Sequence, residues 1–162
     1  MNGIKQNLRV RKITGTISTD DIIPGRYKHA LIHPADMAGH VFENLLPGFA
    51  QTLRTGDVLS CDSTFGIGSS REQAVSSLLA AGIVAVFAPS FGRIFFRNSW
   101  NLGLLAIEID HLPALEGDTV CLDLNKGLVI GPSGVGCFIP PPTEMISMVE
   151  QGGLLAQLRQ SI

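Results

Sequence analysis

A short stretch near the middle of the chain combines residue types that can bind and activate an anion. Residues 65–73, FGIGSSREQ, place two serines and an arginine directly after two glycines. Glycine allows a sharp turn and lets a ligand approach the backbone closely. Residues 72–81 then have the apolar spacing of a helix, and a helix start offers unpaired N–H groups and partial positive charge. Ser69, Ser70 and Arg71 at that start predict a site for a carboxylate or a phosphate.

The same residues also suit an ordinary helix start. Ser69 and Glu72 have the spacing of a capping box, and Ser70 and Gln73 repeat it. One serine can cap the helix while the other faces a ligand, so the two interpretations are compatible.

The segments around this stretch predict an α/β fold, with a mixed or parallel sheet and flanking helices. Apolar runs at 58–62, 83–88 and 104–109 predict buried strands, and helices are expected over 72–81 and 91–102. This alternation favours parallel strands joined by right-handed crossovers. Ligands gather at the carboxyl ends of such strands, which is where we expect the two serines and the arginine.

The flanking segments are less regular. Residues 8–17 alternate basic and apolar side chains, as a half-exposed strand does, and Pro and Gly within 19–27 break regular structure. Asp20 and Asp21 are expected to hold the turn there and not to take part in chemistry. A hairpin is predicted around the turn 125–127, and short helices over 143–150 and 154–161.

Composition narrows the class of protein. The 162 residues, 45% hydrophobic and 16% charged, suit one globular domain spanning 1–162. A formal net charge of −2 gives no reason to expect nucleic acid or an anionic membrane as a partner. No apolar run approaches the roughly 18 residues that a membrane span needs, and the first residues lack the apolar core of a secretion signal.

The cysteines do not form a metal-binding pattern. Cys61, Cys121 and Cys137 are odd in number, far apart and without a C-x-x-C pair. We therefore expect no zinc site and no iron–sulfur cluster bound by this chain. Free thiols of this kind indicate a cytoplasmic protein.

Three stretches, in order along the chain, resemble one protein family. Residues 68–72, GSSRE, resemble a signature of the swivelling domain of aconitase-type hydro-lyases. Residues 19–27, TDDIIPGRY, are similar to the substrate loop of 3-isopropylmalate dehydratase small subunits, and residues 90–98, SFGRIFFRN, to a later segment of that family. Three motifs in matching order are far more specific than one.

The resemblance implies a fold, a partner and a reaction. The fold is the β/β/α swivelling domain, which closes over a large subunit in a heterodimer or heterotetramer. The large subunit carries a [4Fe–4S] cluster, and the small subunit binds no cofactor. The pair interconverts 2-isopropylmalate and 3-isopropylmalate, which are hydroxy-dicarboxylates, by dehydration and rehydration in leucine biosynthesis.

The resemblance also implies roles for individual residues. Ser69 would be the base that takes the carbon-bound proton, with its alkoxide stabilised by the helix start. Ser70 and Arg71 would hold a substrate carboxylate, for which the planar fork of arginine is well matched.

The remaining candidate substrate-binding residues come from two segments. They are Arg26, Tyr27, Lys28, His29 and Arg93. The alternative interpretation of Arg26 is a solvated charge in a loop. The alternative interpretation of Arg93 is a structural ion pair with Glu72 or Glu108.

Residues 28 and 29 leave more than one candidate for the substrate. After the tyrosine, 3-isopropylmalate enzymes tend to have apolar residues and homoaconitase-like relatives an arginine, whereas this chain has Lys28 and His29. A homoaconitase, or a dehydratase for a methylated malate or citrate, is therefore an alternative. A second alternative is a non-catalytic anion-binding module of the same fold.

Overall fold

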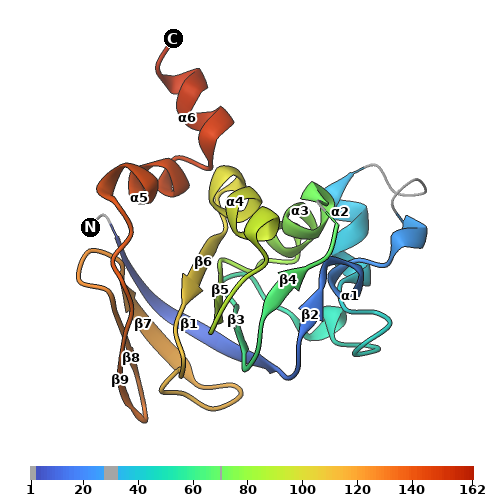
Figure 1. The fold of residues 1–162 in the computed structure, drawn as a ribbon, viewed down its shortest axis with the longest axis horizontal. Coiled ribbons are helices and arrows are strands. Elements are labelled where there is room, and N and C mark those ends of the chain that lie inside the picture. Colours follow the sequence, from blue (N-terminus) through green and yellow to red (C-terminus); the bar gives the residue numbers. More distant parts are fainter. Residues whose placement is uncertain (1–2, 28–32, 70) are drawn as a thin grey trace.

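A mixed β-sheet forms the centre of the structure, a computed structural model that describes residues 3–27, 33–69 and 71–162 (Figure 1). In the described part, the order of its seven strands is β6 (Leu105–Glu108), β5 (Ala85–Ala88), β3 (Val58–Cys61), β1 (Ile4–Ile13), β7 (Thr119–Asp123), β8 (Leu128–Gly131) and β9 (Gly134–Cys137). The first four are parallel to one another, and β7, β8 and β9 pair antiparallel. The predicted α/β fold with a mixed sheet is confirmed.

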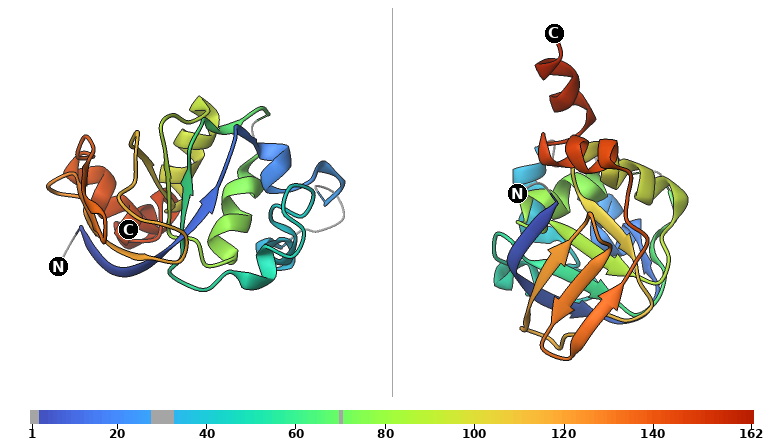
Figure 2. Two further views of the ribbon diagram at one scale, coloured as in Figure 1. Left: turned by 90° about the horizontal axis from the view of Figure 1, so that it is seen from below. Right: turned by 90° about the vertical axis from the view of Figure 1, so that its left-hand side faces the viewer.

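Helices flank this sheet. They are α1 (Thr19–Ile22), α2 (Pro34–Met37), α3 (Glu72–Ala80), α4 (Arg93–Leu102), α5 (Thr143–Glu150) and α6 (Leu154–Gln160), with 3₁₀ turns η1 (Gly25–Tyr27), η2 (Ala38–His40) and η3 (Ala50–Thr52). Helices α3 and α4 lie side by side, and α6 extends outward beyond α5 (Figures 1 and 2). The helices predicted between the strands and at the carboxyl end of the chain are confirmed to within two residues.

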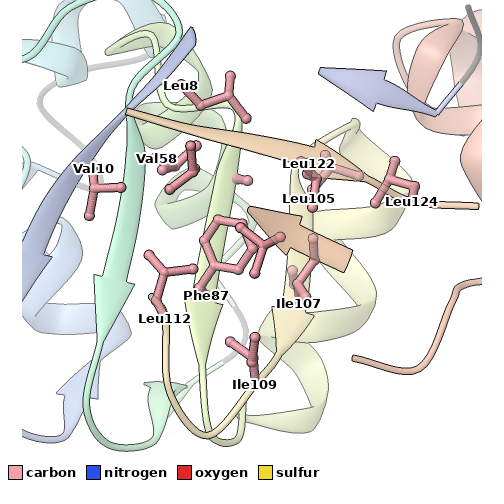
Figure 3. Close-up of a cluster of buried hydrophobic side chains, with 14 of the residues drawn as sticks. Leu8, Val10, Val58, Phe87, Leu105, Ile107, Ile109, Leu112, Leu122 and Leu124 are labelled. Atoms are coloured by element: carbon pink, nitrogen blue, oxygen red, sulfur yellow. The ribbon is translucent and has the colours of Figure 1, made fainter. Parts of the chain in front are cut away.

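The parallel strands β3 and β5 are buried on both faces, which explains their uninterrupted apolar runs. Side chains alternate between two cores: Val58 packs into one and Leu59 into the other. Figure 3 shows the first core, where side chains of the parallel strands meet those of β7. The second core lies under α3, where Val75 and Leu78 are fully buried.

A separate two-stranded sheet differs from the sequence prediction. The strand predicted over 8–17 ends at Ile13, and the chain turns at Gly15 before entering β2 (Ile17–Ser18). There β2 pairs in parallel with β4 (Phe65–Ile67), which was not predicted as a strand. Both strands are too short to show a periodic pattern. The strand β9 was also not predicted, because two of its four residues are glycines and give no hydrophobic pattern.

Two glycines let β4 pack directly on the start of α4. A Cβ added to Gly92 would lie 2.2 Å from the carbonyl oxygen of Gly66. A Cβ added to Gly66, which has a φ of +83°, would lie 2.3 Å from the ring of Phe95. No side chain larger than hydrogen is accommodated at either position, so the backbone of β4 has little freedom to shift.

The loop over 19–27 is more regular than the sequence suggested. Its first residues form α1, and the capping box belongs to this helix: Asp21 N donates to Ser18 Oγ at 3.1 Å, and Ser18 N donates to Asp21 Oδ2 at 2.8 Å. The expectation that Asp21 stabilises a turn is confirmed, whereas the expectation of wholly irregular structure is wrong for Thr19–Ile22.

A buried carboxylate ties the sheet together away from this loop. Asp57, whose side chain is 2% exposed, accepts from Arg9 Nε at 2.8 Å and Nη2 at 2.7 Å, and from the backbone N–H of Arg54 at 2.8 Å. Burial alone would raise the pKa of Asp57. The hydrogen bonds from Arg9 and Arg54 outweigh burial, so the net pKa lies below its ordinary value of 3.8.

The Asp57→Asn variant is expected to lose stability and its acid sensitivity. A lowered pKa stabilises the fold fully above the unfolded-state value, and this contribution disappears as the pH falls from about 3.8 through the folded-state pKa. Denaturant unfolding at pH 7 should show a loss of about 3 kcal/mol, and the decline of stability toward pH 3 should be shallower than in the parent chain.

The matched control is Glu116→Gln, which removes an exposed partner of Arg11. It should cost less than about 1 kcal/mol. Equal pH profiles for the parent chain and Asp57→Asn would contradict this account of Asp57.

Candidate active site

The turn that carries the candidate catalytic residues leaves the end of β4. Strand β4 ends at Ile67, and Gly68 (φ +104°) leads to Ser69, which is exposed. The strand is held on one side by β2. On the other side, Phe65 N donates to Ser90 O and Gly92 N donates to Phe65 O, both at 3.0 Å. The turn therefore starts from a fixed point beside α4.

Ser69 does not cap α3, so the predicted capping box with Glu72 is wrong. Arg71 is the N-cap residue of this helix, and its own side chain makes no capping hydrogen bond. Ser69 lies two residues earlier, which is too far back for its hydroxyl to take the N-cap position. Its backbone carbonyl instead accepts a hydrogen bond from Oγ1 of the buried Thr19 at 3.1 Å. Ser70, the second predicted hydroxyl, lies outside the described residues.

The guanidinium of Arg71 lies against the loop that follows α1. Nη1 donates to Asp20 Oδ1 at 2.5 Å and, at 3.4 Å, to the carbonyl oxygen of Ile23. A Cβ added to Gly25 would lie 3.3 Å from Nη2. Both of these hydrogen bonds use Nη1, so among the described residues Nη2 and Nε are left for a ligand. The partner Asp20 is 66% exposed, whereas the Arg71 side chain is only 18% exposed.

Arg26 and Tyr27 meet at one carboxylate. Arg26 Nη2 donates to Glu43 Oε2 at 2.7 Å, and the Tyr27 hydroxyl donates to the same oxygen at 2.5 Å. His40 Nδ1 lies 3.2 Å from Glu43 Oε1, and its ring stacks on Tyr27 with centroids 4.2 Å apart. The hydrogen bond from Tyr27 contributes most to lowering the pKa of Glu43, followed by that from His40. Lys28 and His29 lie outside the described residues.

Arg93 lies in a different environment from the other candidates. It is exposed in the first turn of α4, directly after Gly92, and it borders a hollow of about 390 Å³ between α4 and α5. The preferred alternative of an ion pair with Glu72 or Glu108 is wrong, because no ion pair of Arg93 occurs among the described residues. The structure places the Arg93 backbone beside β4, and its side chain faces α5.

The site as a whole joins two segments about fifty residues apart. Ser69 and Arg71 come from the turn before α3, and the residues that hold them, Thr19 and Asp20, come from α1. Sequence reasoning missed Thr19 and Glu43 and assigned Asp20 only to turn formation. The Ser18–Asp21 capping spacing could have located α1, but no local signal indicates which side chains meet across the two segments.

The arrangement of potential metal ligands and the length of the helices bear on metal binding and membrane insertion. Within 3–27, 33–69 and 71–162, no group of three or more His, Cys, Asp or Glu side chains is arranged to hold a metal ion. No helix in the described part of the chain combines the length and apolarity that crossing a membrane requires.

Comparison with known proteins defines the class first. Residues 49–112, which include β3, β4, α3 and β5, match the family model of the aconitase C-terminal domain. The crystal structure of 3-isopropylmalate dehydratase (LeuD) from Methanocaldococcus jannaschii is similar, with a TM-score of 0.85 and 34% sequence identity over 98% of this chain and 95% of that chain. The fold is therefore that of an aconitase-type domain.

The curated relatives are more specific. This chain is 40% identical over 154 residues to 3-isopropylmalate dehydratase small subunit 2 of Archaeoglobus fulgidus, which covers 94% of this chain and 93% of that protein. It is 39% identical to the methanogen homoaconitase small subunit of Methanothermobacter thermautotrophicus over 100% of this chain and 95% of that protein. The chain belongs to the family of 3-isopropylmalate dehydratase small subunits, and the suspected resemblance is confirmed.

Replacing Thr19 with valine should loosen the turn that carries Ser69. Valine keeps the shape of threonine but cannot donate to the Ser69 carbonyl, a hydrogen bond typically worth about 1 kcal/mol. Amide hydrogen exchange at residues 68–72 should therefore become about fivefold faster. Thr19→Ser keeps the hydroxyl and should exchange as the parent chain does. Equal exchange in the valine variant would show that this bond does not hold the turn.

Proposed function

We propose that this chain is the small subunit of a hydro-lyase that interconverts 2-isopropylmalate and 3-isopropylmalate by dehydration and rehydration, as in leucine biosynthesis. The observation that carries the proposal is the exposed Ser69 beside Arg71, whose guanidinium is oriented by Asp20. Family membership supports the reaction class, because relatives at 40% and 41% identity are named 3-isopropylmalate dehydratase small subunits. Residues 1–162 act in it as one domain.

Ser69 is proposed to take the proton from the carbon next to the one that bears the hydroxyl. A serine hydroxyl is a weak base, so the reaction needs an environment that stabilises its alkoxide. The first turn of α3 offers this, because its N–H groups and positive dipole end follow Ser69 closely in the chain and the N-cap residue Arg71 does not cap them with its own side chain. Donors that are already in place require no reorganisation when charge develops on Ser69 Oγ.

Arg71 is proposed to bind a substrate carboxylate together with Ser70. Nη2 and Nε of Arg71 present two parallel N–H groups, which match the two oxygens of a carboxylate. Asp20 holds the opposite corner of the guanidinium through Nη1 and so sets its orientation before substrate arrives. Tyr27 and Arg26, with Lys28 and His29, are proposed to line the side of the site that receives the substituent, and Arg93 to extend the charged rim.

A large subunit is proposed to complete the site, in a heterodimer or heterotetramer. A [4Fe–4S] cluster on that subunit would supply Lewis-acid chemistry for the departing hydroxyl. This chain then contributes the base, the carboxylate ligand and the walls that exclude water. We place the pair in the cytoplasm, where the free thiols of Cys61, Cys121 and Cys137 stay reduced.

Ser69→Ala should abolish catalysis without preventing assembly. Turnover of the subunit pair on 3-isopropylmalate should fall by at least about 10³-fold, because both proton abstraction and its positioning are lost. The measurement is steady-state kinetics with a purified large subunit, and co-elution in gel filtration reports assembly.

The control is Ser76→Ala, on the exposed side of the same helix, where the hydroxyl only donates to the carbonyl of Glu72. This variant should retain full turnover. If Ser69→Ala keeps full turnover as well, the proposed base is wrong and a non-catalytic anion-binding module is favoured.

A homoaconitase-type substrate is the second candidate function. The relative named methanogen homoaconitase small subunit is as similar as the dehydratase small subunits, and Lys28 and His29 offer cationic groups to an additional carboxylate. A dehydratase for a methylated malate or citrate remains within the same class.

Changing Lys28 and His29 together to leucine should move substrate preference toward an alkyl substituent. Removal of two polar side chains favours burial of an isopropyl group and disfavours a carboxylate. The ratio of kcat/KM for 3-isopropylmalate over a homocitrate-type acid should rise roughly tenfold or more. Changing the exposed Lys126 and Gln160 to leucine serves as a control for added surface apolarity. An unchanged ratio in the first variant would rule out these residues as determinants of specificity.

A further inference from the structure

One carboxylate outside the recognised motifs organises the substrate loop. Glu43 accepts hydrogen bonds from Tyr27 and Arg26 on the same oxygen, Oε2, and its other oxygen lies 3.2 Å from His40 Nδ1. Asn44, the next residue, accepts from Arg26 Nη1 at 3.0 Å, so both ends of the Arg26 fork are engaged. The Arg26 guanidinium also lies over the Tyr27 ring, 4.8 Å from its centroid.

Glu43 is itself held firmly by the core. The preceding residue, Phe42, is fully buried and has a φ of +58°, a conformation that side-chain-bearing residues adopt only when their surroundings impose it. Its N–H donates to the carbonyl of Ile22 at 2.9 Å, and its ring makes edge contacts with Phe49 and Phe65. Because Phe42 cannot move independently of the core, the carboxylate of Glu43 points at the loop from a fixed position.

The loop in turn touches the carboxylate-binding arginine. Arg26 and Tyr27 belong to η1, whose first residue, Gly25, lies so close to the Arg71 guanidinium that a Cβ added to it would be 3.3 Å from Nη2. Tyr27 N also donates to Pro24 O at 3.0 Å, which closes the turn. A continuous set of contacts therefore runs from the core through Glu43 and η1 to Arg71.

We infer that Glu43 is a positioning residue that fixes η1, and thereby sets which substituent the site accepts. The inference rests on the proposed function, since it assigns the wall of that same site. Two cationic or polar side chains on one carboxylate oxygen give η1 a single arrangement, whereas solvated side chains would adopt many. Glu43 acts through Arg26 and Tyr27 and does not touch the substrate.

The first test measures the contact without catalysis. Tyr27 is the only tyrosine in the sequence, so labelling tyrosine with ¹³C gives one ring signal from the full chain. Glu43→Gln should shift this signal, because the phenol loses a charged acceptor. The control Glu144→Gln changes an exposed residue on α5, which lies far from α1 in Figure 1, and α1 leads directly into the loop that carries Tyr27. This control should leave the signal unchanged. An unchanged signal in Glu43→Gln would overturn the inference.

The second test measures specificity in the assembled enzyme. Glu43→Gln should raise KM about tenfold while kcat changes less, and it should alter the ratio of kcat/KM between 3-isopropylmalate and a homocitrate-type acid. In a background of Arg26→Gln with Tyr27→Phe, Glu43→Gln should have no further effect beyond about twofold, because its partners are already gone.

The outcomes separate this inference from the proposed function. An equal effect of Glu43→Gln in both backgrounds would show a general structural loss and would overturn the positioning role. Normal KM and unchanged specificity in Glu43→Gln, alongside an inactive Ser69→Ala, would overturn only the role of Glu43. Full turnover of Ser69→Ala would overturn the proposed function first, whatever Glu43→Gln does.

Discussion

The contact between the 19–25 segment and the turn before α3 is the constraint on which the candidate site depends. A buried threonine hydroxyl donates to the carbonyl of Ser69, and Asp20 receives the guanidinium of Arg71. Both bonds cross from one segment to another about fifty residues later in the sequence. Without them, a short exposed turn between two glycines and a helix would sample many conformations, and preorganised catalysis would lose its geometry.

The rest of the fold holds these two segments next to each other. The pairing of β2 with β4 aligns them, and the close approach of Gly66 and Gly92 fixes β4 against α4. The central strands β3 and β5 are buried on both faces, so a hydrophobic core lies on each side of the sheet that supports the site. The candidate site residues Ser69 and Arg71 precede α3 in a short turn, whereas the rigidity is in the sheet, which is the usual division in α/β enzymes.

Three of the carboxylate–arginine pairs in the described part of the chain illustrate two different roles. Asp57 holds Arg9 in a nearly dry setting, where the pair contributes to stability. Asp20 and Glu43, which hold Arg71 and Arg26, are 66% and 36% exposed, and ion pairs of such solvated carboxylates contribute little free energy and chiefly restrict direction. A carboxylate–arginine pair thus stabilises the sheet at Asp57 and orients an arginine side chain at Asp20 and Glu43. The solvent exposure of the carboxylate determines which of these two roles the pair has.

Much of the fold could be read from the sequence. Helices α3, α4, α5 and α6 and the long parallel strands follow from local hydrophobic periodicity. The strands β2 and β4 could not be read, because two or three residues carry no period and form a strand only through pairing with a distant segment. The strand β9 could not be read because two of its four residues are glycines, which give no hydrophobic pattern. The capping box was assigned to Ser69, where the spacing allowed it, but it formed at Ser18, where the chain geometry required it.

The sequence by itself determined the family and supplied the candidate site residues. The GSSRE motif, the TDDIIPGRY loop and the SFGRIFFRN segment depend only on residue order, and family membership confirms them. Only the tertiary structure decided that Thr19 supports Ser69, that Asp20 orients Arg71, and that Glu43 gathers Arg26 and Tyr27. The physical reason is that hydrogen bonds between distant segments depend on where the core places each backbone, and no local pattern of residue types encodes that placement.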